Sequence, residues 1–440
     1  MHHTPDSPLA AATPAGLTDD ERRTLDALDV PGIVADLCEL VALPTVGGTD
    51  AESEVQHLLA DRARALDLDV DLWRMDLDSL TTHPDFPGQE VERREAWGLV
   101  ASTGSVHPDH GELPALALQG HVDVVPSGDP ARWVGDAFTP RVVGGRVHGR
   151  GTCDMKAGVV ANLAALRAVR AAGLTLARPA ALHFVVGEED GGLGAFGTLR
   201  RGHRAEACVI TEPTSGTITT ANAGALTFEL SVPGMATHGS TAYAGVSALD
   251  AYLPVHAALA RLQARRNARV DPLMGEYPVA YPLSVGTVRC GDWASSVPDL
   301  LVAEGRLGVA LDEDPIDARA ELEAAVAEAA ARDPWLREHP PTVRWTGGQF
   351  ASGRYDASSP LFATVGAAHA EVTGSGAPRE RGAPYGSDLR LYAEAGVPTL
   401  HYGPGDVRLA HGPDESVTVR EVVTVTEVLV LALLRTCGVA

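Results

Sequence analysis

Five short segments combine histidine or acidic residues with glycine, proline or the end of an apolar run. They are Gly120–Pro126, Gly149–Gly158, Gly187–Gly192, Thr211–Thr214 and Ala410–Glu415. Each alone fits an ordinary turn, a helix cap or a buried histidine, but together they supply His, Asp, Glu, Glu and His, too many ligands for a closed structural zinc site. The set suits two divalent metal ions that share one carboxylate and activate a bridging water, with a further carboxylate as general base. These segments therefore predict a two-metal hydrolase.

Other catalytic chemistries lack their residues in this sequence. The glycine-rich segment around Asp154 lacks the GxGxxG pattern of a dinucleotide site, and no GxSxG segment marks a serine nucleophile. Cys153 adjoins a predicted ligand rather than a base. The five cysteines are widely spread and form no CxxC pair, so we expect neither a disulfide framework nor a zinc knuckle.

Strand-like and helix-like segments alternate around the candidate residues. Short apolar runs predict strands at Val70–Trp73, Trp97–Ser102, Pro114–Gln119, Ala180–Gly187 and Ala207–Thr211. Helical spacing predicts helices at Ala51–Leu66, Asp154–Ala172 and Leu193–Arg201. This alternation predicts an α/β catalytic domain whose central, mostly parallel sheet is flanked by helices, with ligands at the carboxyl ends of the strands.

The pattern changes near residue 218. A long strand is expected at Thr219–Val232, further strands at Leu283–Cys290 and Leu300–Leu311, and helices at Ser247–Ala264 and Ile316–Arg332. This order predicts a small α+β unit of the β-α-β-β-α-β, ferredoxin-like kind. The α/β pattern returns after Pro340, starting with Thr342–Thr346. We therefore expect a discontinuous catalytic domain (1–217 and 339–440) with an inserted dimerisation or lid domain (218–338).

The net charge of the chain indicates which kinds of partner are unfavourable. The 440 residues include 35 basic and 58 acidic ones, which gives a net charge of −23. Nucleic acids and anionic membranes are therefore unfavourable partners. The first residues lack the basic and apolar regions of a secretory signal, and no apolar stretch approaches 18 residues, so a cytoplasmic protein is expected.

The motifs GHVDVVP, GRGTCDMKAG, GEEDGG, TEPT and GPGDVRLAHGPDESV, in this order, resemble the M20 metallopeptidase family. That family includes acetylornithine deacetylase, succinyl-diaminopimelate desuccinylase, aminoacylase and glutamate carboxypeptidase, and the resemblance runs from about residue 30 to the C-terminus. It implies two zinc ions, although such mixed ligands also accept Co or Mn. One ion would be held by His121, Asp154 and Glu212, and the other by Asp154, Glu189 and His411.

The same resemblance implies two catalytic roles at the metal site. Glu188 would be the general base that takes a proton from the bridging water and passes it to the leaving amine. Asp123 would orient His121. Lys156, the only lysine of the chain, has a family counterpart that is not a ligand, so a structural salt bridge is expected there.

In the inserted domain, the segment Pro233–Ser240 resembles the family's dimerisation motif. There His238 would reach the active site of a partner subunit and stabilise the oxyanion, which implies a homodimer formed through residues 218–338. Arg306, Ser387 and Arg390 match regions that commonly bind the substrate carboxylate. Ser295 stands where family members often carry Asn. This departure counts against a polar contact between this position and the partner subunit.

The resemblance is strongest to the acetylornithine deacetylase branch. We therefore expect a two-metal amidohydrolase that cleaves the amide of a small N-acyl amino acid. The alternative within the same chemistry is a dipeptidase or carboxypeptidase acting on short peptides. A metal-binding protein that has lost its activity would be expected to lose the general base. Glu188 is retained, which favours an enzyme.

Overall fold

The computed structural model describes residues 16–107 and 112–440. Within them, nine strands form the larger sheet, in the order β1-β2-β6-β3-β7-β15-β8-β13 with β14 beside β8. Their bounds are β1 (Asp69–Arg74), β2 (Trp97–Ser102), β3 (Leu116–His121), β6 (Ala180–Val185), β7 (Cys208–Pro213), β8 (Ile218–Asn222), β13 (Gly353–Arg354), β14 (Glu380–Ala383) and β15 (Thr399–Gly403). The four central strands β6, β3, β7 and β15 are parallel, which confirms the predicted mostly parallel central sheet, and the antiparallel pairs lie toward its edges.

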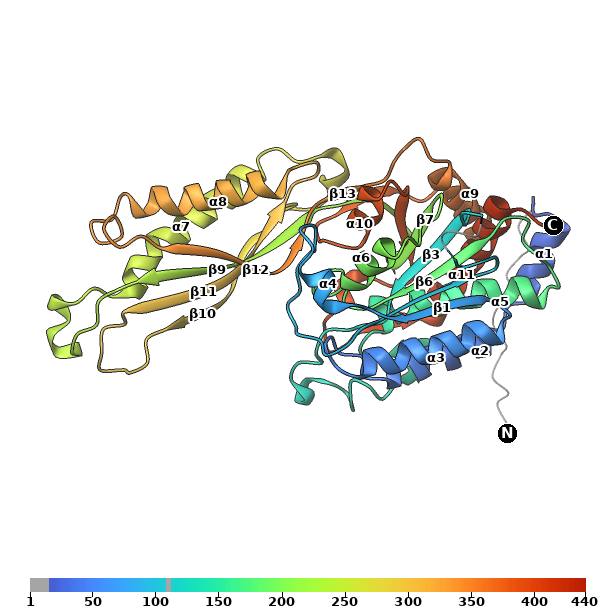
Figure 1. Cartoon of the computed structure of the whole chain (residues 1–440), viewed down its shortest axis with the longest axis horizontal. Coiled ribbons are helices and arrows are strands. Elements are labelled where there is room, and N and C mark those ends of the chain that lie inside the picture. The colour runs from blue at the N-terminus through green and yellow to red at the C-terminus, as the bar shows by residue number, and fades with distance from the viewer. Residues whose placement is uncertain (1–15, 108–111) are drawn as a thin grey trace.

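Helices cover both faces of this sheet (Figure 1). The larger core contains residues of α2 (Val30–Ala42), α3 (Ala51–Ala65), α5 (Ala157–Ala171), α9 (Leu361–Thr373) and α11 (Val419–Cys437). The smaller core, on the opposite face, contains residues of α6 (Leu193–Arg200) and α10 (Leu389–Glu394). Along β3, Leu116 and Leu118 join the first core and Ala117 the second, as the alternation of side chains in a strand requires. Both faces are buried, which explains the continuous apolar runs in the sequence.

Shorter elements complete this part of the chain. They are α1 (Asp19–Asp26), α4 (Leu77–Thr81) and a small sheet of β4 (Arg141–Val143), β5 (Arg146–His148) and β16 (Ser416–Thr418). Thr18 caps α1 and Thr418 caps α11, and each forms a capping box with a glutamate three residues later. The capped α11 is buried along most of its length.

The second large sheet is antiparallel and projects from the first (Figure 1). Its order is β10-β11-β9-β12, and its bounds are β9 (Gly224–Pro233), β10 (Leu283–Cys290), β11 (Leu300–Val309) and β12 (Thr342–Phe350). Helices α7 (Ala248–Arg266) and α8 (Pro315–Ala330) contribute to the core of this sheet. Buried and half-buried residues alternate along β9, so one face packs on the helices and the other meets solvent.

Two expected strands differ from the structure. The long strand predicted at Thr219–Val232 is interrupted: β8 belongs to the larger sheet and β9 to the smaller one. Gly224 starts β9 where a side-chain carbon would lie 2.3 Å from the carbonyl oxygen of Phe350. The strand predicted at Thr342–Thr346 lies in the smaller sheet rather than the α/β sheet, because β12 pairs with β9 and places Trp345 opposite Phe228. It supplies the last strand of the predicted β-α-β-β-α-β order, and we propose that the inserted unit spans residues 224–350.

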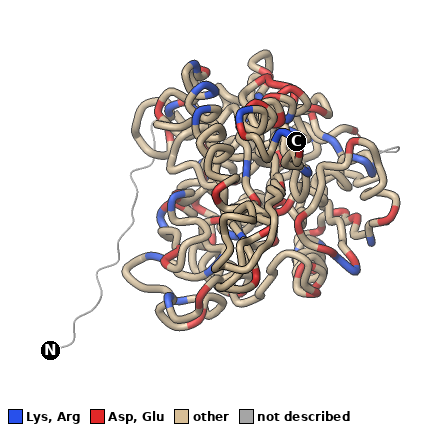
Figure 2. Tube along the Cα trace, turned by 90° about the vertical axis from the view of Figure 1, so that its left-hand side faces the viewer, with Lys and Arg blue, Asp and Glu red and all other residues tan. Residues whose placement is uncertain are grey.

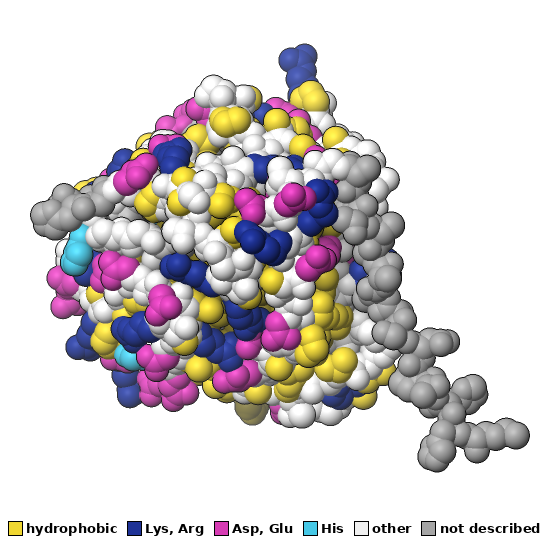
Figure 3. Space-filling view, turned by 90° about the vertical axis from the view of Figure 1, so that its right-hand side faces the viewer, with side chains coloured by type: hydrophobic (Ala, Val, Ile, Leu, Met, Phe, Trp, Pro, Cys, Tyr) yellow, Lys and Arg dark blue, Asp and Glu magenta, His cyan; other side chains and the backbone are white. Residues whose placement is uncertain are grey.

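The surface carries mixed charge. Acidic and basic residues are interspersed along the chain when the molecule is viewed from the smaller sheet (Figure 2). The opposite end also alternates charged and apolar side chains (Figure 3). In the described part of the chain, no helix combines the length and apolar character needed to cross a membrane.

Candidate metal centre

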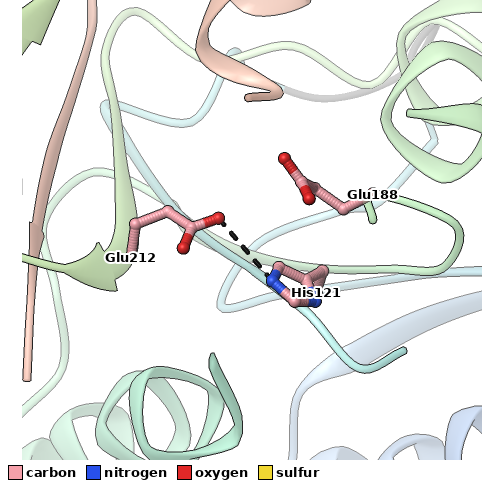
Figure 4. Close-up of side chains that lie close together, drawn as sticks. All are labelled: His121, Glu188 and Glu212. Carbon is pink, nitrogen blue, oxygen red and sulfur yellow. Dashed lines mark ion pairs between the residues drawn. The ribbon is translucent and has the colours of Figure 1, made fainter. Parts of the chain in front are cut away.

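The predicted ligands lie together at one edge of the larger sheet. His121 is the last residue of β3, Glu212 lies near the end of β7, and Glu188 and Glu189 follow β6. These three strands are parallel and adjacent, so their carboxyl ends meet at the same edge. Figure 4 shows Glu188 and Glu212 approaching the ring of His121 from two of these strand ends. His121 is fully buried, and Glu188 and Glu212 are 7% and 5% exposed.

Asp154 lies between the two histidines. Its Oδ1 is 3.1 Å from Nε2 of His121, and its Oδ2 is 3.5 Å from Nε2 of His411. His121 Nε2 also lies 3.6 Å from Glu212, and His411 Nε2 lies 3.1 Å from Glu189. Each oxygen of Asp154 thus faces a different histidine and its accompanying glutamate. This is the arrangement expected of a carboxylate shared by two ions.

Donor atoms for a cation are already close to one another. The ligand atoms of His121, Glu188 and Glu212 all lie within 4.8 Å of one another, as do those of His121, Asp154 and Glu189. In the described residues, no Arg or Lys forms an ion pair with any of the four carboxylates. Burial, followed by the neighbouring carboxylates, raises the pKa of Glu188 and of Glu212. A buried acidic cluster of this kind is stabilised by cations, so the residues present fit divalent metal ions.

The histidines compensate part of this charge when no metal is bound. Hydrogen bonds with Asp154 and Glu189 raise the pKa of His411 to about 10, although burial opposes its protonation. A metal ligand must be a neutral imidazole, so a metal ion bound at His411 would displace this proton.

Asp123 supports the centre in two ways. Nδ1 of His121 donates to the backbone carbonyl oxygen of Asp123 at 3.0 Å, which leaves Nε2 of His121 directed at the cluster. Its carboxylate lies 3.6 Å from Nδ1 and accepts the backbone N–H groups of Glu188 and Glu189. The carboxylate of Asp123 therefore holds the turn that carries the two glutamates, whereas its carbonyl group orients His121.

A buried ion pair that the sequence analysis missed holds Asp154. The carboxylate of Glu415 accepts the backbone N–H groups of Cys153 and Asp154 and pairs with Arg150. Arg150 and Glu415 are 2% and 1% exposed. Both residues lie inside the recognised motifs, but nothing in their spacing indicated that they pair across 265 positions of the chain.

Two other charged residues near the centre, Lys156 and Asp190, form contacts that the sequence did not predict. Lys156 forms no ion pair within the described residues. Its Nζ donates to the carbonyl oxygens of Leu40 and Leu43, each at 2.8 Å. The predicted salt bridge is therefore wrong, and Lys156 instead binds backbone carbonyl groups at the C-terminus of α2. Asp190, the third acid of its motif, turns to Arg93 at 2.9 Å rather than to the cluster.

The residues expected to bind substrate are differently placed. Arg390 is 4% exposed, donates to the carbonyl oxygens of Ser387 and Gly191 and stacks on Phe350. The Ser387 hydroxyl is hydrogen-bonded to the His401 ring at 3.0 Å. These contacts assign Ser387 and Arg390 to the framework around the centre.

The two candidate residues of the inserted unit lie outside the cluster of this chain. Arg306 lies on β11, paired with Ser284 and Thr227. His238 is exposed in the turn between β9 and α7, where its ring accepts the backbone N–H of Ser240. That turn is the yellow-green segment at the end of the smaller sheet remote from the larger one (Figure 1). The catalytic role of His238 stays a prediction.

Known proteins resemble this chain in sequence and in fold. The family model for peptidase family M20/M25/M40 matches residues 117–435. N-formyl-4-amino-5-aminomethyl-2-methylpyrimidine deformylase of Bacillus subtilis is 26% identical over 352 residues, which cover 75% of this chain and 81% of that protein. Acetylornithine deacetylase of Erwinia tasmaniensis is 26% identical over 403 residues, which cover 88% and 93%. The solved structure of the di-peptidase Dug1p from Saccharomyces cerevisiae is similar in fold, with a TM-score of 0.73, 14% identity and coverage of 95% and 98%.

Proposed function

Since the chain belongs to peptidase family M20/M25/M40, whose members are metal-dependent hydrolases of amide and peptide bonds, we propose that it removes the acyl group of an N-acyl amino acid. The family predicted from the motifs is thus the family of this chain. The named deformylase and deacetylase relatives support acyl removal as the reaction. The proposed substrate is a small molecule with a linear amide, in the manner of acetylornithine deacetylase.

We propose that two divalent ions, zinc above all, are held by the ligands around Asp154. His121, Glu212 and Asp154 would hold one, and Asp154, Glu189 and His411 the other. Such ions polarise the scissile carbonyl group and lower the pKa of a water molecule. The oxygen and nitrogen donors also accept Co or Mn.

The free carboxylate of Glu188 is the observation that carries the proposal. Within the described residues, neither a hydrogen bond nor an ion pair engages it, although it is buried beside His121 and Glu212. Burial raises its pKa, which suits a group that exchanges protons near neutral pH. Glu188 takes a proton from the attacking water and delivers it to the leaving nitrogen. The turn held by Asp123 fixes its position for both transfers.

A homodimer is part of the proposal. β10 is an edge strand of the smaller sheet, and most of its residues are exposed. Exposed apolar side chains occur on the same unit at Tyr243, Leu253 and Trp293. A second copy covering this unit would account for their exposure. It would also allow His238 to act in the partner's active site, where it would donate a hydrogen bond to the oxyanion.

The test is a hydrolysis screen of N-acetyl amino acids and dipeptides with the metal-loaded protein. Chelator-sensitive release of acetate supports the deacylase. Cleavage of dipeptides alone would move the activity to the peptidase alternative. If the protein hydrolyses neither kind of substrate with any added metal, both the deacylase and the peptidase activities are rejected.

A further inference from the structure

An arginine holds the turn that carries Glu188. Asp190 lies in the same turn (Gly187–Gly192, the glutamate turn), and both of its carboxylate oxygens accept hydrogen bonds from Arg93, each at 2.9 Å. The same guanidinium donates from Nε and Nη2 to the two oxygens of Glu52, at 2.9 and 3.0 Å. The side chain of Arg93 is 1% exposed, so these charge-assisted bonds are shielded from solvent.

The backbone before Arg93 also binds Asp190. The N–H groups of Glu90 and Val91 donate to Oδ2 of Asp190, at 3.2 and 3.1 Å. All these donors come from the stretch Pro87–Arg93, which we name the link segment. Because one buried carboxylate receives donors from both the backbone and the side chain of this segment, the glutamate turn is anchored to it.

The link segment also contacts the smaller sheet. The backbone N–H of Gln349, on β12, donates to the carbonyl oxygen of Pro87 at 2.9 Å. The hydroxyl group of Thr227, on β9, donates to the carboxylate of Glu90 at 3.2 Å. In Figure 1 the link segment is part of the blue loop beside α4, where the two sheets meet. It therefore lies between the inserted unit and the glutamate turn.

Three glycines bring these backbones into direct contact. A side-chain carbon at Gly88 would lie 2.3 Å from the carbonyl oxygen of Gly347, in the irregular part of β12. One at Gly191 would lie 2.1 Å from the carbonyl oxygen of Gly88. Glycine permits such close approach of two backbones. A displacement of β12 would therefore reach the glutamate turn with no flexible side chain in between.

We propose that the link segment couples the position of the smaller sheet to the position of Glu188, with Arg93 and Asp190 as positioning residues. In the part of the chain that the structure describes, the Glu188 carboxylate makes no hydrogen bond or ion pair, so its position depends on the turn. Proton transfer requires the base within hydrogen-bond reach, and a small misplacement can cost about 10²-fold in rate. This inference rests on the proposed function of Glu188 and adds control of that base by the inserted unit.

Arg93→Lys tests the link at the glutamate turn. Lysine keeps the positive charge but cannot hold two carboxylates with a planar fork. At saturating metal, we expect kcat to fall roughly 10- to 100-fold, with KM and metal content unchanged. Amide hydrogen exchange within residues 187–192 should become roughly 10-fold faster, while exchange in β6 stays the same.

Arg266→Lys is the matched control for this variant. Arg266 is also buried, at 4% exposure of its side chain, and also binds two carboxylates, those of Glu313 and Glu321. Both partners lie in the inserted unit rather than in the glutamate turn. This variant should therefore leave exchange within 187–192 unchanged.

Gly88→Ala tests the link at the smaller sheet. The added carbon would meet Gly347 of β12 and force the two backbones apart, although Arg93 and Asp190 are retained. We expect the same fall in kcat and the same faster exchange within 187–192. Gly173→Ala is the matched control, because Gly173 has a similar φ (70° against 82°) but its added carbon would meet nothing within 4 Å.

The exchange measurement separates this inference from the proposed function. Exchange within 187–192 that is unchanged, or no faster than in the control variants, would overturn the link. An effect of Arg93→Lys without one of Gly88→Ala would overturn the coupling to the smaller sheet. Faster exchange in both variants of a protein that hydrolyses no substrate would reject the proposed function and retain the mechanical link. Normal hydrolysis with unchanged exchange would do the reverse.

Discussion

Asp154 directs one carboxylate oxygen to His121 at 3.1 Å and the other to His411 at 3.5 Å. The two histidines come from segments almost 300 residues apart, and each is accompanied by its own glutamate. A single side chain therefore joins the two halves of the candidate centre. Removing it should disturb both halves at once.

Asp154→Ala should lower the metal content of both proposed sites, because the shared oxygen ligands are lost together. We expect the bound metal to fall from about two ions per chain to less than one, with the fold retained. Elemental analysis after gel filtration measures this. Asp414→Asn, which removes an exposed carboxylate near His411, is the control and should keep full occupancy. Unchanged metal in Asp154→Ala would contradict the shared role.

Glu188→Gln should retain metal and stability but lose turnover by at least about 10²- to 10⁴-fold, because the amide cannot accept the proton of water. The matched measurement is kcat together with metal content and the melting temperature. Near-normal kcat would remove Glu188 from the mechanism.

His238→Ala should lower kcat by roughly 10²- to 10³-fold, as for other oxyanion donors. Mixing this variant with Glu188→Gln tests where His238 acts. Exchange of subunits creates dimers in which one site has both an intact Glu188 and a partner that carries His238. Activity should then reappear. If His238 acts within its own chain, or not at all in catalysis, mixing restores nothing beyond the separate variants.

Acid stability should depend on Asp71. Burial opposes its ionisation, but hydrogen bonds from Arg201 and His203 outweigh burial and lower the pKa of Asp71. The folded state thus binds this proton less readily than the unfolded chain does, whose Asp has a pKa of about 3.9. The stabilisation is complete above that value and disappears as the pH falls through the lower folded value.

Asp71→Asn should therefore reduce the free energy of unfolding at neutral pH by about 1–2 kcal/mol and flatten the loss of stability in acid. Urea unfolding between neutral pH and pH 3 measures both effects. Asp78→Asn, which replaces a carboxylate that holds no ion pair in the described structure, is the control. An unchanged acid slope in Asp71→Asn would show that this ion pair contributes nothing.

Much of the candidate site could be predicted from the sequence, because three of the proposed ligands directly follow or end an apolar run. His121, Glu188 and Glu212 lie near the ends of parallel neighbours, and the geometry of a parallel sheet brings such ends together. The segments around Asp154 and His411 also stand out by residue type, and the motif resemblance implies their roles as ligands. These residue types are informative because buried carboxylates require compensation.

Residues whose function depends on distant partners could not be predicted in this way. Arg150 meets Glu415 and Arg93 meets Asp190 only after the chain has folded. Lys156 was expected to bind a carboxylate, yet the nearest acceptors are the backbone oxygens at the end of α2. The strand at Thr342 has no pattern that distinguishes one sheet from the other. Its place is decided by its pairing with β9.

The most direct test is a metal titration of the metal-free protein with hydrolysis of N-acetyl amino acids as the signal. We predict no activity without metal, a rise as zinc is added and a plateau near about two equivalents per chain, as two shared sites require. Hydrolysis that persists without metal, or no hydrolysis at any amount of Zn, Co or Mn, would contradict a two-metal amidohydrolase.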